Sequence, residues 1–184
     1  MRFGTAGIPI STERPSTENG IRKVKQLGLE CMELEFVYSV NVSEERAREV
    51  KRIAKDNDIR LSAHGSYYLN LNAKENQKIG ASKRRIFDAA KRLHDCGGDN
   101  IVFHPGYYLK QDPEKVYQNI KDRLKEIRNN LDDSGYDIML RPETTGKRTQ
   151  FGSLKELLKI SEDIPGIMPC IDFSHLHART SKMN

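Results

Sequence analysis

The sequence predicts an α/β fold, a (β/α)8 TIM barrel of which this chain supplies about the first six strands and five helices. Short β-type runs alternate strictly with helical segments, a pattern typical of βαβ units and a parallel sheet. The first run is closed by Gly7-Ile8-Pro9, and Gly4-Thr5-Ala6-Gly7 lacks the glycine spacing of a dinucleotide-binding loop, which disfavours a doubly wound sheet. Candidate functional side chains stand where the predicted strands end, the rim that carries function in parallel barrels.

The order of the elements follows from helix caps and hydrophobic periodicity. The predicted strands are residues 2–6, 31–37, 59–64, 100–104, 137–143 and 167–172, and the predicted helices are residues 17–27, 44–57, 75–96, 113–131 and 153–160. Ser43 and Ser153 are strong N-cap residues, and Asp112 precedes a proline at the first helical position. Gly28 and the pair Gly97-Gly98 end helices. The apolar positions of the third helix recur near the period of 3.6.

The length predicts a single partial barrel domain over residues 1–184. A closed barrel needs eight strand-helix units and typically about 250 residues. Here the sequence ends soon after the sixth predicted strand, with no sixth helix expected. An open six-stranded sheet leaves an unpaired edge. We therefore expect a chain truncated at its C-terminus, and a monomer when full length.

The composition excludes several classes of protein. A hydrophobic fraction of 36% with 31% charged residues is typical of a soluble globular protein. We expect neither a membrane span nor a signal peptide, and thus a cytoplasmic location. The three cysteines form no C-x-x-C motif, which disfavours a disulfide scaffold or a thiolate zinc site. The net charge of +5 is compatible with a polyanionic partner but does not demonstrate one.

Five strand-end residues are candidate metal ligands: His64, His104, Glu143, Asp172 and His175. Any one strand-end histidine could simply be a polar loop residue, but three histidines with Glu143 and Asp172 on one rim favour a metal centre. Mixed imidazole and carboxylate ligands suit zinc or manganese, and the lack of thiolates favours a catalytic site. Glu143 has two oxygens and could bridge two ions, which would activate water and clamp a phosphate.

Other charged residues are open to two interpretations. His177 and Glu35 are weaker ligand candidates, and His94 is expected on a helix surface or in helix packing. Arg141 should share an inward face with Glu33 and Glu35, and we predict that it pairs with one of them because an unpaired inward charge is costly.

Two aromatic pairs follow predicted strands at the same rim. Tyr67-Tyr68 and Tyr107-Tyr108 could stack on bases or sugars, or could pack the loops over the barrel mouth. Cations in these loops could meet phosphates or be solvated: Lys74, Lys110, Lys147 and Arg148.

Four motifs, in order along the chain, resemble those of endonuclease IV, the zinc-dependent AP endonuclease family 2 on a xylose-isomerase-like TIM barrel. They are His64-Gly65-Ser66-Tyr67, Phe103-His104-Pro105-Gly106, Glu143-Thr144-Thr145-Gly146 and Cys170-Ile171-Asp172-Phe173-Ser174-His175. The resemblance implies hydrolysis of the DNA phosphodiester 5′ to an apurinic or apyrimidinic site, in base-excision repair. It also implies damaged double-stranded DNA as the partner.

The resemblance further implies up to three zinc ions. His64 and His104 would hold one with Glu143, which would bridge to a second ion bound by Asp172, while His175 would serve the third. Glu143 would thus be the central catalytic residue. The zinc site that it forms with His64 and His104 would be the one site whose ligands are all present in this sequence. The family's later ligands and the arginine that some members carry after the second strand have no counterpart in this sequence.

The same resemblance makes Tyr67 and Tyr68 substrate-binding candidates, Tyr67 matching the tyrosine placed near the abasic nucleotide. Two alternatives stay open. One is a divalent-metal sugar isomerase or epimerase on the related barrel, and the other is a barrel remnant that binds DNA or a partner without catalysis. The His-Pro-Gly motif and the Asp-x-x-His pair favour the nuclease.

Overall fold

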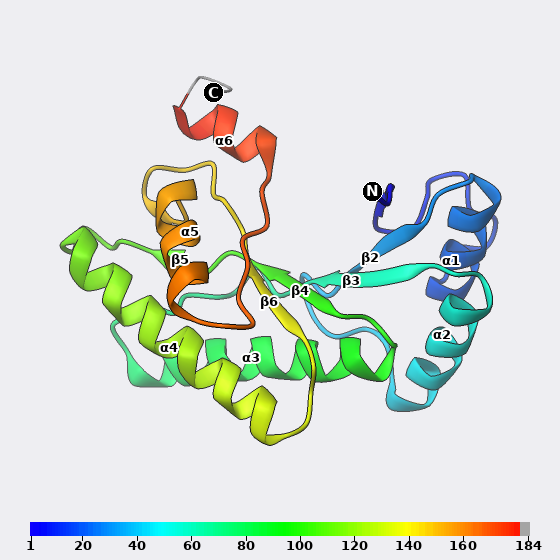
Figure 1. Ribbon diagram of the computed structural model, residues 1–184, viewed down its shortest axis with the longest axis horizontal. Coiled ribbons are helices and arrows are strands. Elements are labelled where there is room, and N and C mark those ends of the chain that lie inside the picture. Colours follow the sequence, from blue (N-terminus) through cyan, green and yellow to red (C-terminus); the bar gives the residue numbers. More distant parts are fainter. Residues whose placement is uncertain (181–184) are drawn as a thin grey trace.

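The computed structural model describes residues 1–180, so the last four residues of the predicted domain lie outside the description. Figure 1 shows a sheet with helices following one another around one side. The strands are β1 (Gly4–Ala6), β2 (Cys31–Glu35), β3 (Arg60–His64), β4 (Asn100–Phe103), β5 (Gly106–Tyr107), β6 (Met139–Pro142) and β7 (Gln150–Phe151). The helices are α1 (Thr17–Gln26), α2 (Glu44–Asp56), α3 (Asn76–Asp95), α4 (Pro113–Asp133), α5 (Leu154–Asp163) and α6 (Phe173–Thr180).

The main sheet is parallel, in the order β1-β2-β3-β4-β6, which confirms the predicted α/β alternation. The predicted N-caps are also confirmed: the side chains of Ser43, Asp112 and Ser153 each accept from the backbone N–H three residues later. These bonds satisfy donors that a helix start leaves free. Gly28 adopts the left-handed φ of 73° that ends α1.

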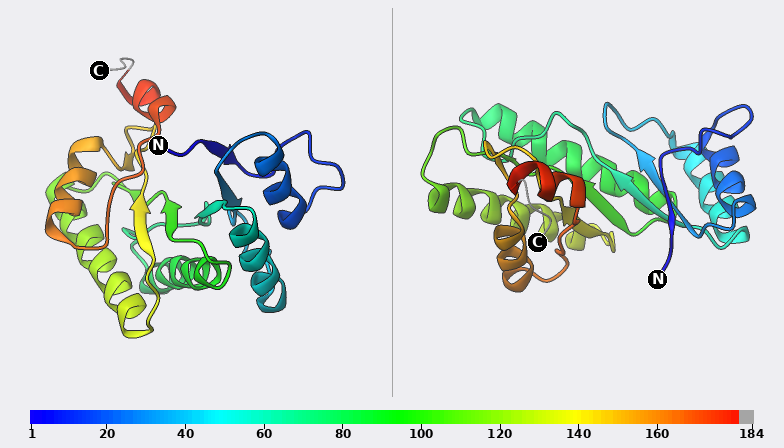
Figure 2. Two further views of the ribbon diagram at one scale, coloured as in Figure 1. Left: turned by 45° about the vertical axis from the view of Figure 1, so that its right-hand side comes forward. Right: turned by 90° about the horizontal axis from the view of Figure 1, so that it is seen from above.

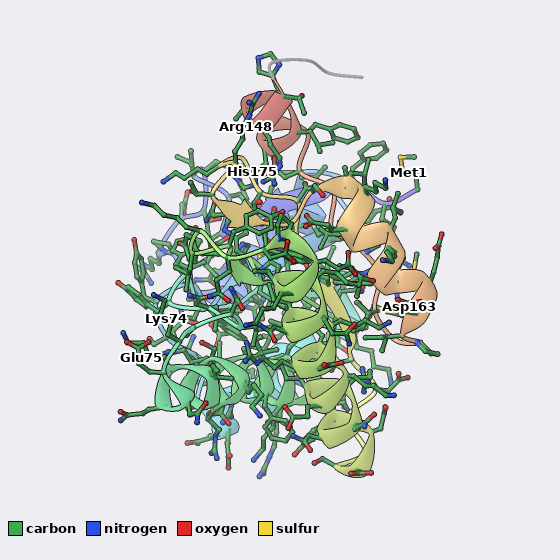
Figure 3. All side chains as sticks on the ribbon, turned by 90° about the vertical axis from the view of Figure 1, so that its left-hand side faces the viewer. Met1, Lys74, Glu75, Arg148, Asp163 and His175 are labelled. Carbon is green, nitrogen blue, oxygen red and sulfur yellow. The ribbon has the colours of Figure 1, made fainter. Side chains whose placement is uncertain are left out.

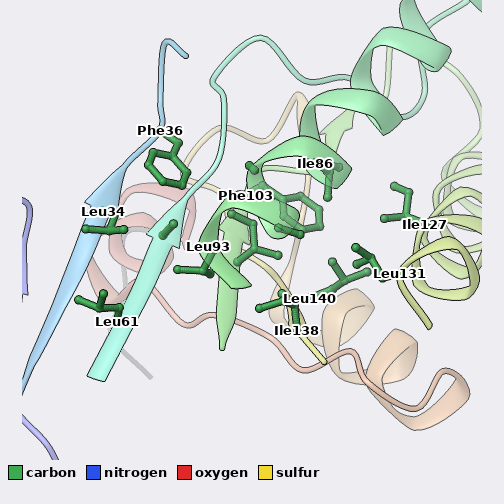
Figure 4. Close-up of a cluster of buried hydrophobic side chains, with 14 of the residues drawn as sticks. Leu34, Phe36, Leu61, Ile86, Leu93, Phe103, Ile127, Leu131, Ile138 and Leu140 are labelled. Atoms are coloured by element: carbon green, nitrogen blue, oxygen red, sulfur yellow. The ribbon is translucent and has the colours of Figure 1, made fainter. Parts of the chain in front are cut away.

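The apolar core lies between the sheet and its helices, and the two further views in Figure 2 show the same helices around it. Figure 4 shows part of this core, which includes Leu34, Phe36, Leu61, Ile86, Leu93, Phe103, Ile127, Leu131, Ile138 and Leu140. Along β3, buried and more accessible residues alternate, so that Leu61 and Ala63 pack inward while Ser62 and His64 line the other face. That second face carries the polar side chains. Within residues 1–180, no helix is both long and apolar enough to span a bilayer.

The sixth predicted strand, residues 167–172, is reduced to two isolated parallel bridges beside β6. Leu140 N donates to Gly166 O, Met168 N to Leu140 O, Cys170 N to Pro142 O, and Thr144 N to Cys170 O. The missing rung is at Pro142, which has no N–H to donate. The chain therefore runs alongside β6 as expected, but the ladder is interrupted just before Glu143.

Two features differ from the sequence-based expectation. Strands β5 and β7 form a small antiparallel pair that was not predicted, since each has only two residues and they are far apart in sequence. The prediction of no sixth helix is wrong, because α6 follows Asp172. The Asp172 carboxylate accepts from the N–H of His175 at 2.7 Å, as an N-cap does, and so begins a helix where a turn was expected.

The connection from α4 into β6 depends on Arg128, a buried guanidinium on α4. It pairs with Asp132 at 2.7 Å and donates to the carbonyl oxygens of Tyr136 and Ile138. These bonds satisfy backbone acceptors of the segment that enters β6. Arg128 thus helps to fix the strand that delivers Glu143.

Replacing Arg128 with methionine should destabilise the protein by about 1–3 kcal/mol, because the buried carbonyl oxygen of Ile138 would lose the guanidinium as its donor. Urea unfolding of Arg128→Met measures this. The matched control is Arg84→Met, which removes an exposed ion pair with Asp88 on α3 and should change stability by less than about 0.5 kcal/mol. Equal effects of the two substitutions would contradict the assigned role.

Candidate metal centre

Three neighbouring strand ends bring His64, His104 and Glu143 together. His64 is the last residue of β3, His104 follows β4, and Glu143 follows β6, and these strands are adjacent in the sheet. One ligand atom from each residue lies within 4.8 Å of those of the other two. The side chains of His64 and Glu143 are only 12% and 9% exposed. The parallel sheet thus converges three strand ends on one partly buried point.

The hydrogen bonds of His64 define which ring nitrogen is free. Its Nδ1 lies 2.8 Å from the carbonyl oxygen of Gly65, an acceptor only, so Nδ1 carries the hydrogen. Its Nε2 faces Glu143 Oε2 at 3.4 Å. In the neutral imidazole, this places a nitrogen lone pair opposite a carboxylate oxygen. A proton or a metal ion between them removes the repulsion, and a carbonyl-bonded Nδ1 is the usual arrangement of a metal-binding histidine.

His104 approaches the same oxygen. Its Nε2 lies 2.6 Å from Glu143 Oε2, yet the atom is buried and lacks a hydrogen-bond partner of acceptable geometry. Close donor atoms without hydrogen-bond alignment are expected where side chains converge on a cation. The two imidazoles and the carboxylate are also a donor set that suits zinc. The residues present therefore fit a divalent metal ion.

Ionisation in this cluster also favours a cation. Burial alone raises the pKa of Glu143, but the adjacent His104 and His64 outweigh it and lower the pKa to about 2. For His64, burial lowers the pKa, whereas Glu143 and the Gly65 carbonyl raise it by more, so that the net pKa is above its ordinary value. Glu143 is thus a carboxylate at every ordinary pH.

A second donor group shares Glu143 and adds Asp172 and His175, again with ligand atoms within 4.8 Å of one another. His175 Nδ1 lies 2.9 Å from the carbonyl oxygen of Thr144, so its Nε2 is the free donor. The ring centroids of His104 and His175 are 5.2 Å apart, so the two donor groups lie next to each other. Figure 3 shows His175 at the end of the molecule formed by α6. The structure thus places His175 in the same donor group as Glu143 and Asp172, and not in a separate group of its own.

The backbone around Glu143 is held by its neighbours. Thr144 Oγ1 accepts from the N–H of Asp172 at 2.9 Å, which joins this strand end to the start of α6. Gly152, next to β7, has a φ of 127°, and a Cβ added there would lie 2.8 Å from the carbonyl oxygen of Glu143. Only glycine allows that approach. Neither Thr144 nor Gly152 was anticipated as a site residue.

The predicted aromatic residues lie beside the centre. Tyr67 packs edge-on against His64 with ring centroids 5.4 Å apart, and it is half exposed. Tyr68 is also exposed, and both rings lie near Tyr38, at 6.0 Å for Tyr67 and 6.5 Å for Tyr68. Sequence reasoning did not single out Tyr38, which follows β2 in the printed sequence. The three tyrosines form an exposed aromatic cluster next to a candidate ligand.

Other candidates are not brought into either donor group. His177 is exposed on α6, and His94 lies on α3 with its ring against Tyr136, as expected for helix packing. Glu35 is exposed at the end of β2. The predicted pairing of Arg141 with Glu33 or Glu35 is not found among the ion pairs of residues 1–180. Arg141 instead donates to Asn100 Oδ1 at 2.6 Å, a neutral partner on the adjacent strand.

Curated relatives include one of close sequence similarity. An uncharacterized protein of Methanocaldococcus jannaschii is 47% identical over 178 residues, which cover 97% of this chain and 63% of that protein. A protein of Chlorobium limicola named probable endonuclease 4 is 30% identical over 120 residues, or 62% of this chain and 40% of the relative. This chain therefore spans less than two thirds of the length of these relatives.

Solved structures share the fold at lower identity. Endonuclease IV from Thermus thermophilus superposes with a TM-score of 0.73 at 20% identity, over 97% of this chain and 65% of that one. A D-psicose 3-epimerase superposes with a TM-score of 0.78 at 19% identity, over 99% and 67%. These matches confirm a partial TIM barrel. Residues 21–183 match the family described as xylose isomerase-like TIM barrel, and the chain belongs to that family.

Proposed function

We propose that the protein is a metal-dependent endonuclease that cleaves DNA on the 5′ side of apurinic or apyrimidinic sites. The observation that carries this proposal is the pair of donor groups sharing Glu143. Divalent ions at such a pair would lower the pKa of a bound water and neutralise charge on a phosphate. Zinc is the ion that the histidine-rich first group suits best. A relative named probable endonuclease 4 is consistent with the proposal.

The roles of the chain's own residues follow from their positions. His64 and His104 would hold one ion with Glu143, and Asp172 with His175 would hold another. Glu143 would bridge the two because its oxygens belong to both groups. Tyr67, exposed and packed on His64, would contact the DNA next to the scissile phosphate, with Tyr68 beside it.

Cations in the loops that follow His104 and Glu143 along the chain support a polyanionic substrate. Tyr108 N donates to Thr149 O, so the loop after β5 and the loop before β7 lie side by side. Lys110 and Lys147 in these loops are exposed, and neither has a carboxylate within 4.0 Å among the described residues. Leu109 and Lys110 both have positive φ, 52° and 58°, a costly conformation for such side chains. A strained turn that presents a lysine is consistent with a binding role.

A sugar isomerase or epimerase is the second candidate, favoured by Glu33. This half-buried carboxylate lies on β2, one strand from His64, and burial raises its pKa. A carboxyl group with a raised pKa suits the proton transfers of sugar chemistry. Similarity to D-psicose 3-epimerase adds to this candidate. This chemistry needs only one ion, however, which either donor group could hold, and so it leaves the other group without a role.

The zinc-loaded protein should cut a duplex that holds a single abasic site, and excess chelator should abolish the cut. Glu143→Gln should lower the rate by at least about 100-fold, since even outer partners of metal ligands contribute 10–100-fold. Gel analysis of an end-labelled duplex measures both. The matched control is Glu35→Gln, a strand-end carboxylate outside both groups. Epimerisation of a ketohexose without any DNA cleavage would reverse the ranking of the two candidates.

Metal affinity of the first group should fall as the pH is lowered and His64 becomes protonated. Burial lowers the pKa of His64, but Glu143 and the Gly65 carbonyl raise it by more, so protons compete for its Nε2 as the pH falls. Glu143, with a pKa of about 2, stays ionised and contributes nothing to the slope above about pH 4. Zinc competition titrations from about pH 5 to 8 measure the effect, and His64→Asn should flatten the curve. An affinity independent of pH over this range would exclude His64 as a ligand.

A further inference from the structure

We propose that Arg179 is a positioning residue that holds Asp172 and His175 against Glu143, and thereby determines whether the second ion binds. The inference rests on the proposed two-ion centre. It concerns α6, the helix that presents His175 and starts from Asp172. The helix has no buried residue, so apolar packing contributes little to fixing its place. Polar contacts must do most of this.

Arg179 supplies most of those contacts. Its Nη1 lies within hydrogen-bond distance of four oxygens in the loop after Glu143: Thr145 O at 3.3 Å, Thr145 Oγ1 at 3.0 Å, Lys147 O at 2.9 Å and Gln150 O at 3.0 Å. The guanidinium is therefore seated among the carbonyl oxygens of residues 145–150. That loop begins two residues after the shared ligand Glu143.

A second chain of contacts ties Arg179 to the rest of the rim. Its Nη2 lies 3.5 Å from the hydroxyl of Tyr108, which donates to Glu156 Oε1 at 2.7 Å. Glu156 in turn completes the capping box of α5 with Ser153. Arg179 thus joins α6 to the loop after β5 and to the start of α5. A fork of several N–H groups is needed for this, which lysine cannot supply.

Thr144 provides the complementary contact at the other end of α6. Its hydroxyl accepts from Asp172 N and its carbonyl accepts from His175 Nδ1, both at 2.9 Å. These bonds orient the two donors locally, next to the ion. Thr144 alone would hold α6 only at its first turn, about which the helix could rotate. The contacts of Arg179 near the other end of α6 would prevent that rotation. Loss of Arg179 should therefore release His175 from the donor group but leave His64 and His104 in place.

The test is a cobalt(II) titration followed by visible absorbance. The wild-type protein should bind two ions. Arg179→Met should keep the first with unchanged affinity and bind the second at least about 10-fold more weakly, as outer partners of ligands do, and Arg179→Lys should recover only part of the loss. Arg84→Met is the matched control, because Arg84 is an exposed arginine whose ion pair with Asp88 lies within α3, and this variant should bind two ions normally.

Hydrogen exchange without metal gives an independent readout. Amides of residues 173–180 should exchange faster in Arg179→Met, with the sheet amides and the urea midpoint unchanged. Two ions bound by Arg179→Met with wild-type affinity, or unchanged exchange in α6, would overturn this inference and leave the proposed nuclease standing. Loss of both ions would overturn it too. A wild-type protein that binds fewer than two ions would overturn the two-ion centre itself.

Discussion

The crowding of donor atoms around one oxygen of Glu143 is the interaction on which the site depends. His64 and His104 both direct Nε2 toward Oε2, at 3.4 and 2.6 Å. The carbonyl oxygen of Gly65 keeps the ring hydrogen of His64 on Nδ1, so Nε2 presents only a lone pair to Glu143. Such an arrangement is unfavourable when neutral and favourable around a cation. The surrounding backbone therefore holds a geometry that a proton or a metal ion between these atoms would stabilise.

The sheet creates this crowding by placing three strand ends at one rim, and Pro142 adjusts it. A proline inside a parallel strand removes one ladder hydrogen bond. Here the lost rung falls between Met168 and β6, one residue before Glu143. The chain leaves regular pairing at that point, and Thr144 regains contact with the neighbouring segment through Cys170 and Asp172. The interruption lets the segment that brings Asp172 diverge from β6 and still return to it.

Local signals in the sequence were sufficient for most of the fold. Serine and aspartate caps set the helix starts to within a residue, and strand-end position alone selected His64, His104 and Glu143. What escaped prediction is long-range. The β5–β7 pair joins two residues to two others across the intervening α4 and β6, and the contacts of Arg179 are made to backbone oxygens. Backbone carbonyls leave no trace in side-chain patterns, so no motif could reveal them. The start of α6 was missed because Asp172 was read as a ligand only, although it also caps the helix.

The second donor group bears most directly on the choice between the two candidate activities. Glu143 and Asp172 present carboxylate oxygens within 4.8 Å of each other. Two negative charges at that distance repel by roughly 1–3 kcal/mol, depending on how far water screens them. An ion between Glu143, Asp172 and His175 would offset this repulsion and would use the order that Thr144 and Arg179 impose on α6. The polar contacts that hold α6 in place are therefore an argument for an ion in the second donor group. With a further ion in the histidine group, the centre would suit the hydrolysis of a phosphodiester better than the transfer of a proton on a sugar.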